Sequence, residues 1–212
     1  MSTKYLVIKE KIKDFKKKIR VDGDKSISIR SLLLASQAIG VSKAKNLLKS
    51  EDVLSAIKCL RSLGIKIMFK NNTCLVEGRG INGFKFRKNI TLDAGNSGTV
   101  GRLILPLIIK TPYKIKIIGD KSLSRRDFSR VTKPLNNIGV NFFPAKKKNL
   151  PLYLKGSNFL RPINYLENLG SAQCKTSIML ACLNTPGEIK ILAKKSRNHT
   201  ELMYKNLNIP IS

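Results

Sequence analysis

An internal repeat limits the possible folds of this chain more than any other feature of its sequence. Three apolar segments of helix length each begin with a serine, at Ser26, Ser97 and Ser171, and these starts lie 71 and 74 residues apart. A second segment with the apolar spacing of an amphipathic helix follows each one in step, beginning near residues 52, 127 and 199. We therefore expect three copies of one pair of helices in the 212 residues.

Short runs of β-forming residues fall between these helices and predict the strands. Single strands are expected at residues 43–47, 113–118 and 188–192, and strand pairs at 65–69 with 74–77 and at 140–143 with 152–155. Asp52 and Asp127 stand where helix N-caps would stand, and Gly64 and Gly139 end the second helix of the first two copies. The repeating unit is therefore βαβαββ.

Three such units predict an α/β fold in which pseudo-threefold repeats bury their helices inside a surround of sheets. The repeats are placed at about residues 21–80, 81–156 and 157–212, and residues 1–20 stand outside them. Strands are expected at 5–8 and 18–21 and are assigned to a separate sheet. The third repeat stops at residues 209–212, inside its first closing strand, so the sequence predicts a truncated repeat in a chain that is cut short.

The charge of the chain leaves three interpretations open. With 41 Lys and Arg against 13 Asp and Glu, the net charge is +28, which suits a nucleic-acid binder, a site for small polyanions, or a drift of composition toward Lys, Ile and Asn. The absence of Trp and a content of only 5 Tyr leave little material for stacking on bases. A hydrophobic content of 42% excludes a disordered polybasic tail.

The cysteines and the apolar runs indicate the compartment. Four cysteines without a CxxC pair, and a single histidine, provide no set of zinc ligands. No apolar run approaches the roughly 20 residues of a membrane-spanning helix, and residues 1–18 contain no apolar core of a signal peptide. We therefore expect a cytoplasmic protein with reduced thiols.

The start of the first long helix is a candidate anion site. Gly23, Asp24, Lys25 and Ser26 precede it or begin it, but their order lacks the spacing of a nucleotide-binding P-loop. Small residues and a lysine at a helix N-terminus still favour an anion. Arg30 follows about one turn later, near the same face of the helix. The alternative is an exposed lysine beside a capping serine.

The second repeat carries two further candidates. Residues 96–99 open its long helix, where Gly98 lets a ligand approach the backbone closely, and Arg102 lies four residues on. A plain helix start is the alternative interpretation of residues 96–99. Arg125 and Arg126 precede the next helix, although the helix dipole disfavours cations at that end. A bound carboxylate or phosphate would offset this cost.

The third repeat repeats the pattern. Its long helix opens with Ser171, Ala172 and Gln173, whose hydroxyl and amide groups suit the recognition of hydroxyls and carboxylates. The adjacent Cys174 is more simply a small hydrophobic residue than a nucleophile, and Arg197 starts the last helix. Polar and basic groups thus gather at helix N-termini in all three repeats. In a pseudo-threefold unit these termini can converge on a small polyanion that carries phosphate and carboxylate.

Together these residues resemble the enolpyruvyl transferase family, most closely its members that act on shikimate 3-phosphate. The resemblance rests on segments in the family's order: GDKSISIR at 23–30, SEDVLSAIKCLRSLG at 50–64, DAGNSGTVGRL at 93–103, GDKSLSRRDFSRV at 119–131, GSAQCKTSIMLACL at 170–183 and SRNHTE at 196–201. Members that use UDP-N-acetylglucosamine fit less well, because they have Asn after the first Lys where this chain has Ser26.

The resemblance implies a site for two substrates, phosphoenolpyruvate and shikimate 3-phosphate. It implies that Lys25 and Gln173 reach both. Gly98 and Arg125 are implied to bind phosphoenolpyruvate. The residues implied to bind shikimate 3-phosphate are Ser26, Arg30, Ser171, Ala172, Gln173 and Arg197. The implied reaction transfers the enolpyruvyl group to the 5-hydroxyl of shikimate 3-phosphate, releases phosphate and needs no metal or other cofactor.

The family's complete enzyme is expected to be a monomer of two similar lobes, of which this chain matches the first. The resemblance places the acid and base groups in the second lobe, together with the strands of residues 1–20. No catalytic residue is therefore assigned in this chain, and negligible turnover is expected from it alone. Two alternatives stay open: a basic nucleic-acid-binding module on a related repeat fold, and a half-enzyme that works with a separate second lobe.

Overall fold

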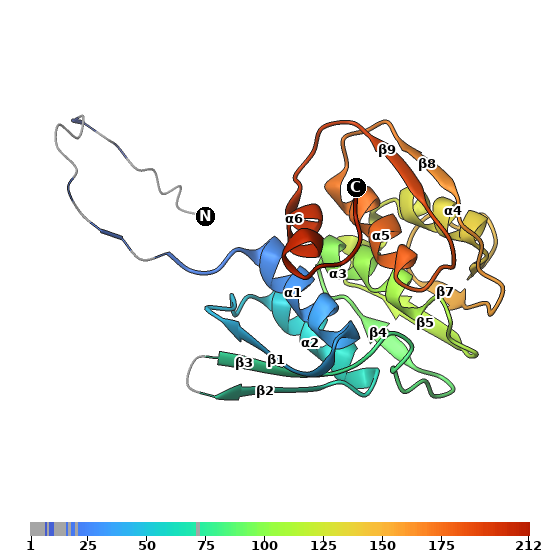
Figure 1. The fold of residues 1–212 in the computed structure, drawn as a ribbon, viewed down its shortest axis with the longest axis horizontal. Coiled ribbons are helices and arrows are strands. Elements are labelled where there is room, and N and C mark those ends of the chain that lie inside the picture. The colour runs from blue at the N-terminus through green and yellow to red at the C-terminus, as the bar shows by residue number, and fades with distance from the viewer. Residues whose placement is uncertain (1–6, 8, 11–15, 17, 20, 71–72) are drawn as a thin grey trace.

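The protein is represented by a computed structural model that describes residues 7, 9–10, 16, 18–19, 21–70 and 73–212 (Figure 1). Its helices are α1 (Lys25–Gln37), α2 (Glu51–Ser62), α3 (Gly98–Leu103), α4 (Ser129–Ile138), α5 (Ala172–Cys182) and α6 (His199–Asn206), with short 3-10 helices η1 (Leu105–Ile108) and η2 (Leu123–Arg125). Its strands are β1 (Ile39–Lys45), β2 (Lys66–Lys70), β3 (Thr73–Arg79), β4 (Thr91–Asp93), β5 (Lys114–Ile118), β6 (Asn141–Phe143), β7 (Leu152–Lys155), β8 (Asn164–Glu167) and β9 (Lys190–Ala193). The mixed α/β class predicted from the sequence is confirmed.

The strands form three separate sheets. Residues 91–155 supply the four-stranded sheet β4-β5-β7-β6, in which β4 and β5 are parallel and β7 is antiparallel to both β5 and β6. Residues 39–79 supply β1-β3-β2, all antiparallel, and residues 164–193 supply the parallel pair β8-β9. Among the described residues, these two sheets therefore have fewer strands than the sheet of residues 91–155.

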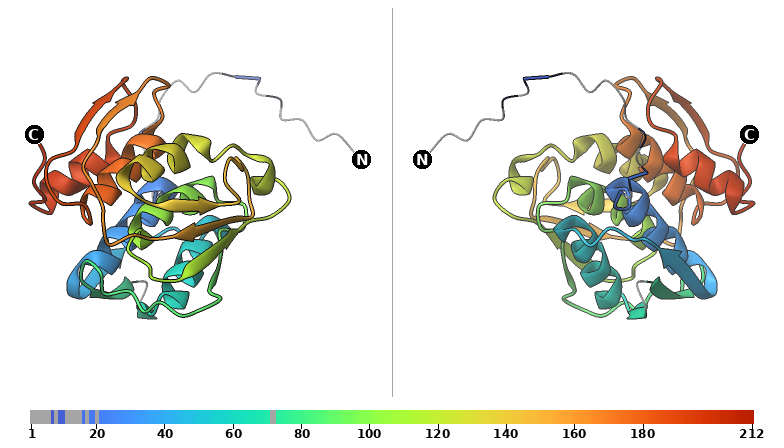
Figure 2. Two further views of the ribbon diagram at one scale, coloured as in Figure 1. Left: turned by 90° about the vertical axis from the view of Figure 1, so that its right-hand side faces the viewer. Right: turned by 90° about the vertical axis from the view of Figure 1, so that its left-hand side faces the viewer.

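The core lies between these sheets, and the long helices fill it. Ile29 and Leu33 of α1, Leu103 of α3 and Ile178 of α5 have no exposed surface. Helices that bury apolar residues on several faces belong to the interior of a protein. Figure 1 shows α1, α3 and α5 in the centre with the sheets around them, and Figure 2 shows the same arrangement from two sides.

The helix ends differ from the predictions in two places. The second apolar run does not form one helix: α3 ends at Leu103, and Pro106 lies in η1, because proline removes a backbone donor and clashes with the preceding turn. Asp52 is not an N-cap, since Ser50 occupies that position and Asp52 lies in the first turn of α2. Asp127 stands just before the N-cap Phe128, but its Oδ1 accepts a 2.6 Å hydrogen bond from the Ser129 amide.

The strand predictions hold at most positions and fail at two. The strand expected at 43–47 begins earlier, at Ile39, because β1 pairs with β3 from Ile39↔Arg79 onward. Residues 209–212 form no strand. The strand expected at 18–21 is not formed by the described residues of that segment, where Ile19 and Val21 are 71% and 68% exposed. The strand expected at 5–8 lies almost wholly outside the described residues.

All four cysteines are free thiols. Burial raises the pKa of the Cys59 thiol to about 12 and that of Cys182 to about 11, so these thiols stay protonated near neutral pH. Within the described part of the chain, no helix is long and apolar enough to cross a membrane.

Candidate functional site

The N-terminus of α1 places a lysine and a serine at the surface. Asp24 caps the helix, and its Oδ1 accepts a 2.7 Å hydrogen bond from the Ile27 amide. Lys25 is the first helical residue, and its Nζ lies 3.1 Å from Oδ2 of Asp52 on α2. The half-exposed Ser26 follows. The ion pair fixes the direction of the Lys25 side chain while leaving 49% of its surface accessible.

Arg30 is the buried member of this group. Its residue surface is 4% exposed, and its guanidinium donates to three oxygens. Nη1 donates to the Ser26 carbonyl at 3.1 Å, Nε to Oγ1 of Thr200 at 3.0 Å, and Nη2 to Oγ1 of Thr176 at 3.2 Å. Among the described residues these are the acceptors of Arg30, and they use one hydrogen on each nitrogen, which leaves one N–H on each of Nη1 and Nη2 for a further acceptor. The oriented pair suits a carboxylate or phosphate.

A second arginine lies close enough to affect Arg30. Burial lowers the pKa of Arg30, and the charge of Arg197, just before α6, lowers it further. The ion pair between Lys175 and Glu201 joins α5 to α6 beside these groups. Two like charges at a partly desolvated position repel each other, and a bound dianion would relieve that repulsion.

The N-terminus of α3 brings two guanidinium groups against a glycine. Ser97 caps the helix by accepting a 3.3 Å hydrogen bond from the Val100 amide. A methyl group on Gly98 would lie 2.9 Å from Nη1 of Arg102 and 3.1 Å from Nη1 of Arg126. A side chain here would therefore have to shift the guanidinium of Arg102, and glycine leaves both cations where they are.

The N-terminus of α5 meets that of α3 through one glutamine. Gln173 accepts a 2.9 Å hydrogen bond from Nη1 of Arg102 and donates one of 3.0 Å to Oγ1 of Thr99. Arg102 also donates to the Asp127 carbonyl at 3.0 Å and lies 5.0 Å from the ring centroid of Phe128. Burial lowers the pKa of Arg102. This network fixes the amide of Gln173 in a single orientation.

Ser171 and Ala172 complete the start of α5. Ser171 is the N-cap: its Oγ accepts from the Cys174 amide at 3.3 Å, and its own amide donates to Glu167 at 2.8 Å. Ala172 is the first helical residue and is half-buried. The hydroxyl oxygen of Ser171 therefore accepts a hydrogen bond from the helix backbone, while the hydroxyl proton can still be donated to another group.

The structure brings most of the predicted residues into two neighbouring groups. Ser26 and Arg30 adjoin α6 and the segment that carries Arg197, while Gly98 and Gln173 meet through Arg102. The exposed Arg125 ends η2 without a described contact to either group, so its role stays a prediction.

Two arginines at the candidate site were noted in the sequence but were not assigned to a substrate. Arg126 approaches Gly98, and Arg102 links α3 to α5 through Gln173. The sequence contained an indication of a role for both Arg102 and Arg126. Arg102 lies four residues after Gly98, on the same helix face, and Arg126 is the neighbour of Arg125 at an unfavourable helix end.

Comparison with known proteins places this arrangement in a family. A family model described as EPSP synthase (3-phosphoshikimate 1-carboxyvinyltransferase) matches residues 9–212. The 3-phosphoshikimate 1-carboxyvinyltransferases of Streptococcus pyogenes serotypes M4 and M1 are 43% identical over 187 residues, which is 87% of this chain and 44% and 43% of theirs. The solved EPSP synthase from Acinetobacter baumannii superposes with a TM-score of 0.82 at 33% identity, over 88% of this chain and 43% of that one.

The chain thus spans less than half the length of the relatives that it matches. The family model covers nearly all of its described residues, including every helix N-terminus of the candidate site. This protein belongs to the EPSP synthase family.

Proposed function

We propose that this chain forms the half of an EPSP synthase active site that binds shikimate 3-phosphate and one side of phosphoenolpyruvate. The observation that carries the proposal is the placement of Lys25, Arg126 and Arg197 beside the starts of α1, α3 and α6. The buried guanidinium of Arg30 adds two N–H groups that have no acceptor among the described residues. Helix N-termini and arginine forks are both suited to phosphate and carboxylate.

Each of the two groups of residues binds a different substrate. Lys25, Ser26, Arg30 and Arg197 form the part that receives the phosphate of shikimate 3-phosphate, where positive charge and N–H donors are concentrated. Gly98, with the guanidinium groups of Arg102 and Arg126, forms the part that receives phosphoenolpyruvate. Gln173 lies at the boundary and reaches toward both, and Ser171 and Ala172 line the same edge. Arg125 is kept as a contact of phosphoenolpyruvate from the family resemblance.

The reaction proposed for the complete enzyme is an addition followed by an elimination. A proton adds to the methylene carbon of phosphoenolpyruvate, and the 5-hydroxyl of shikimate 3-phosphate bonds to the cationic carbon and loses its proton. The tetrahedral intermediate then expels phosphate and loses a methyl proton, which restores the double bond. The acid and base groups are assigned to the second lobe. The cations of this chain hold the anionic groups of both substrates.

Binding of shikimate 3-phosphate to the isolated chain tests the proposal. Isothermal titration calorimetry should detect weak binding, and Arg197→Gln should weaken it by about 10-fold or more, because charged hydrogen bonds contribute roughly 1.5–3 kcal/mol. Arg87→Gln, at an exposed position in the loop between β3 and β4, is the matched control and should bind as the parent does. Equal affinities for the two variants would contradict the assigned site.

Turnover provides the second test. The isolated chain should release no phosphate from the two substrates above the uncatalysed rate. Release should begin when the C-terminal portion of a Streptococcus pyogenes relative is added, because that portion supplies the assigned acid and base groups. Turnover by the chain alone at an ordinary enzyme rate would show that the assignment of these groups is wrong.

A further inference from the structure

The outer face of the four-stranded sheet β4-β5-β7-β6 combines lysines with aromatic rings. Side chains alternate between the two faces of a strand, and the inward set, including Ile115 and Leu154, has no exposed surface because it packs on the core. The outward set lies on the other face of the sheet. It includes Lys114 and Lys116 of β5, Tyr153 and Lys155 of β7, and Phe143 of β6. The proposed substrate site uses none of these five residues.

Two aromatic rings on this face share one cation. Phe143 and Tyr153 are opposite each other in the antiparallel pair of β6 and β7. Nζ of Lys114, on β5, lies 4.8 Å from the centroid of each ring. Phe143 is 38% exposed, and Tyr153 is half-buried. A cation–π contact at an exposed position is weak, so the ammonium can leave the rings for an anion and uncover their faces.

The charge of this face is almost entirely positive. Lys114, Lys116 and Lys155 supply it, and Asp93, on the edge strand β4, is the one acid among the described residues of the face. Oδ1 of Asp93 already accepts a 2.8 Å hydrogen bond from the Gly95 amide. The three ion pairs among the described residues involve other lysines. The face therefore has a positive potential that a polyanion would neutralise.

A basic hollow continues this surface past β6. It has a volume of about 690 Å³ and lies between α4 and the loop that follows β6. Phe143 lines this hollow and also lies beneath Lys114, so the hollow and the sheet face meet at its ring. The described lining residues include no acid and four lysines, Lys133, Lys146, Lys147 and Lys148. Cations therefore surround the exposed ring on both sides of β6.

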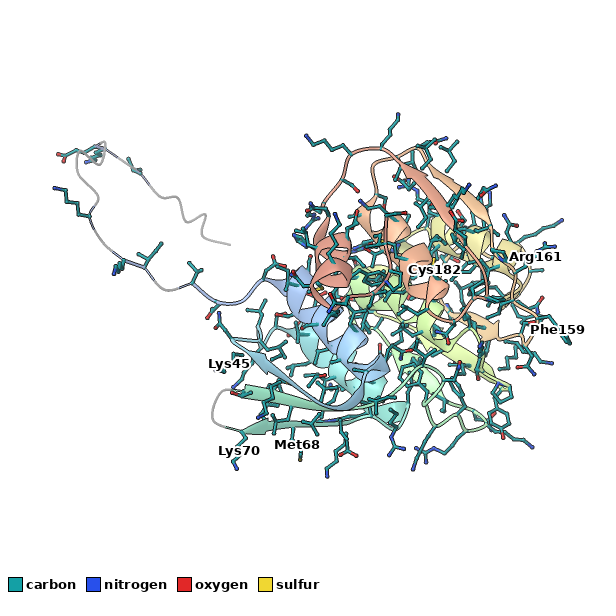
Figure 3. The ribbon with its side chains drawn as sticks, viewed as in Figure 1. Lys45, Met68, Lys70, Phe159, Arg161 and Cys182 are labelled. Carbon is teal, nitrogen blue, oxygen red and sulfur yellow. The ribbon has the colours of Figure 1, made fainter. Side chains whose placement is uncertain are left out.

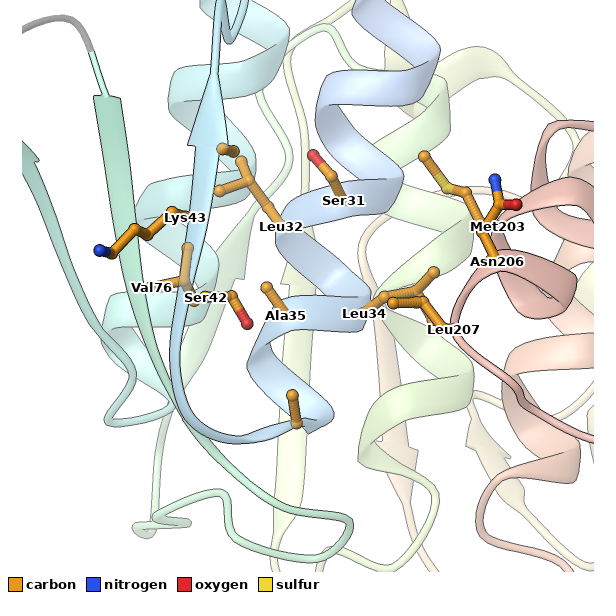
Figure 4. Close-up of a pocket in the computed structure, with 12 residues that line it drawn as sticks. Ser31, Leu32, Leu34, Ala35, Ser42, Lys43, Val76, Met203, Asn206 and Leu207 are labelled. Atoms are coloured by element: carbon orange, nitrogen blue, oxygen red, sulfur yellow. The ribbon is translucent and has the colours of Figure 1, made fainter.

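The hollow between β1, α1 and α6 differs in chemistry (Figure 4). It measures about 300 Å³, and its lining is mainly apolar, with Leu34, Met203 and Leu207 among its residues. Lys43 is the one charged residue among those that line it, and Figure 4 shows its side chain extending away from α1. A polyanion finds no comparable cluster of cations there. Of these two hollows, the one beside β6 is therefore suited to a polyanion.

We propose that the outer face of β5, β7 and β6, together with the hollow beside β6, binds single-stranded nucleic acid. Bases stack on the rings of Phe143 and Tyr153, and the lysines of the face and of the hollow hold the phosphates. The rings favour a nucleic acid over a polyanion without bases, which would use the lysines alone. They favour a single strand because a duplex keeps its bases stacked inside. Every base has a π face, so the sequence of the strand matters little.

Fluorescence anisotropy with two oligomers tests the proposal. One probe is an oligo(dT) of about 20 nucleotides, and the other is an abasic oligomer of the same length, which keeps the phosphates but has no bases. The chain should bind oligo(dT) about 10-fold or more tightly than the abasic oligomer, because base–aromatic stacking adds to the attraction between charges. Equal affinities for the two probes would mean that charge alone is responsible and would overturn the proposal.

A double variant at the rings tests where the bases bind. Phe143→Leu with Tyr153→Leu removes both π faces and keeps an apolar side chain at each position. Its affinity for oligo(dT) should fall by about 10-fold or more, while its affinity for the abasic oligomer stays unchanged. The matched control is Phe69→Leu on β2, because Phe69 is 40% exposed and lies beneath Lys49, with Nζ 5.5 Å from the ring centroid. A control that lost as much affinity as the double variant would contradict the assigned face.

The lysines of the face provide an independent test that leaves the rings in place. Lys114→Gln with Lys116→Gln should weaken the dependence of oligo(dT) affinity on salt, by roughly 0.7 in the logarithmic slope per lost phosphate contact. Lys43→Gln with Lys45→Gln is the matched control, because these exposed lysines have the same spacing along β1 of another sheet. The control should keep the slope of the parent. The same decrease of the slope in both double variants would indicate diffuse attraction over the whole surface and would overturn the proposal.

Discussion

At the scale of single residues, the site depends on how a buried arginine is held. Arg30 packs among the helices, and the hydroxyls of Thr176 and Thr200, themselves 2.7 Å apart, accept from two of its nitrogens. The carbonyl of Ser26 accepts from the third. Desolvating a guanidinium costs free energy unless its donors are satisfied, so these oxygens keep the charge in place while two N–H groups stay directed elsewhere.

Replacing one of these oxygens should measurably destabilise the fold. Thr200→Val removes the acceptor of Arg30 Nε and should lower the free energy of unfolding by about 1–3 kcal/mol, because a buried charged donor is left without a partner. Thr200→Ser keeps the oxygen and should recover most of the loss. Urea denaturation followed by circular dichroism gives both values. A Val variant as stable as the parent would show that the hydroxyl of Thr200 contributes nothing to the free energy of unfolding.

Asp120 gives stability that depends on pH. Hydrogen bonds from the Leu123 amide and from Asn96 hold the pKa of this carboxyl below its usual value. A lowered folded-state pKa stabilises the protein above the unfolded pKa, and this contribution is lost as the pH falls through the folded pKa. The stability difference between the parent and Asp120→Asn should therefore be constant above about pH 5 and shrink below about pH 4.

Asn96→Ala serves as the matched variant for this prediction. It removes one of the two hydrogen bonds to Asp120, and the Leu123 amide still stabilises the ionised carboxylate. The stability difference between the parent and Asn96→Ala should therefore change with pH in the same direction as for Asp120→Asn, but by less. The measurement is the urea midpoint between pH 3 and 7. A difference between parent and Asp120→Asn that does not change with pH would mean that the carboxyl has the same pKa in both states.

The sequence identified candidate residues by their type but could not resolve the directions of two neighbouring arginines. Gly98 and Gln173 were identified, and both lie in the network of Arg102. The choice between Arg125 and Arg126 depends on the backbone direction at η2, where Arg125 ends the 3-10 turn and Arg126 already has extended dihedral angles. Spacing along the chain contains no information about that change of direction.

At the scale of elements, two glycines at positive φ, one at a helix end and one in a strand, allow a paired test of backbone strain. Gly139 ends α4 at φ +123°, and a Cβ there would lie 2.7 Å from the carbonyl oxygen of Phe159. Gly40 in β1 has φ +90° with open space around it. Both angles are unfavourable for residues with a side chain, but only Gly139 adds a clash with backbone.

Alanine substitutions should therefore differ in a defined order. Gly40→Ala should lower the free energy of unfolding by about 1–2 kcal/mol through the positive φ alone, and Gly139→Ala should cost clearly more. Thermal and urea denaturation of the two variants give the comparison. Equal losses would show that the loop containing Phe159 moves away without a cost.

The elements were predictable where local chemistry decides them. β7 was expected at 152–155 and is found there, and Gly64 follows the C-cap of α2 at φ +85°. The misses have tertiary causes. Pairing with β3 sets the start of β1, and a strand at 209–212 has no described partner strand to pair with, so its sequence pattern alone does not produce one.

At the scale of the whole molecule, the net charge of +28 is balanced by few ion pairs. Three salt bridges are found among the described residues, and Figure 3 shows nitrogen-tipped side chains around much of the outline, including Lys45, Lys70 and Arg161. Such a surface attracts any polyanion without a specific site. Charge alone therefore cannot separate substrate binding from non-specific binding to nucleic acid, but the location of the responsible charges can.

Removing charge at a distance from the site should separate the two activities. Lys146→Gln with Lys147→Gln deletes two charges from the loop after β6, and the double variant should bind a 20-nucleotide single-stranded DNA more weakly with a shallower salt dependence, by roughly 0.7 per lost phosphate contact. Its affinity for shikimate 3-phosphate should stay unchanged. Arg197→Gln should show the reverse pattern, a loss for the small ligand that far exceeds the loss for DNA. Titrations with each ligand at 50 and 200 mM salt measure both. If both variants weakened DNA and shikimate 3-phosphate in parallel, one diffuse basic surface would explain all binding, and the assignment of a site at the helix N-termini would fail.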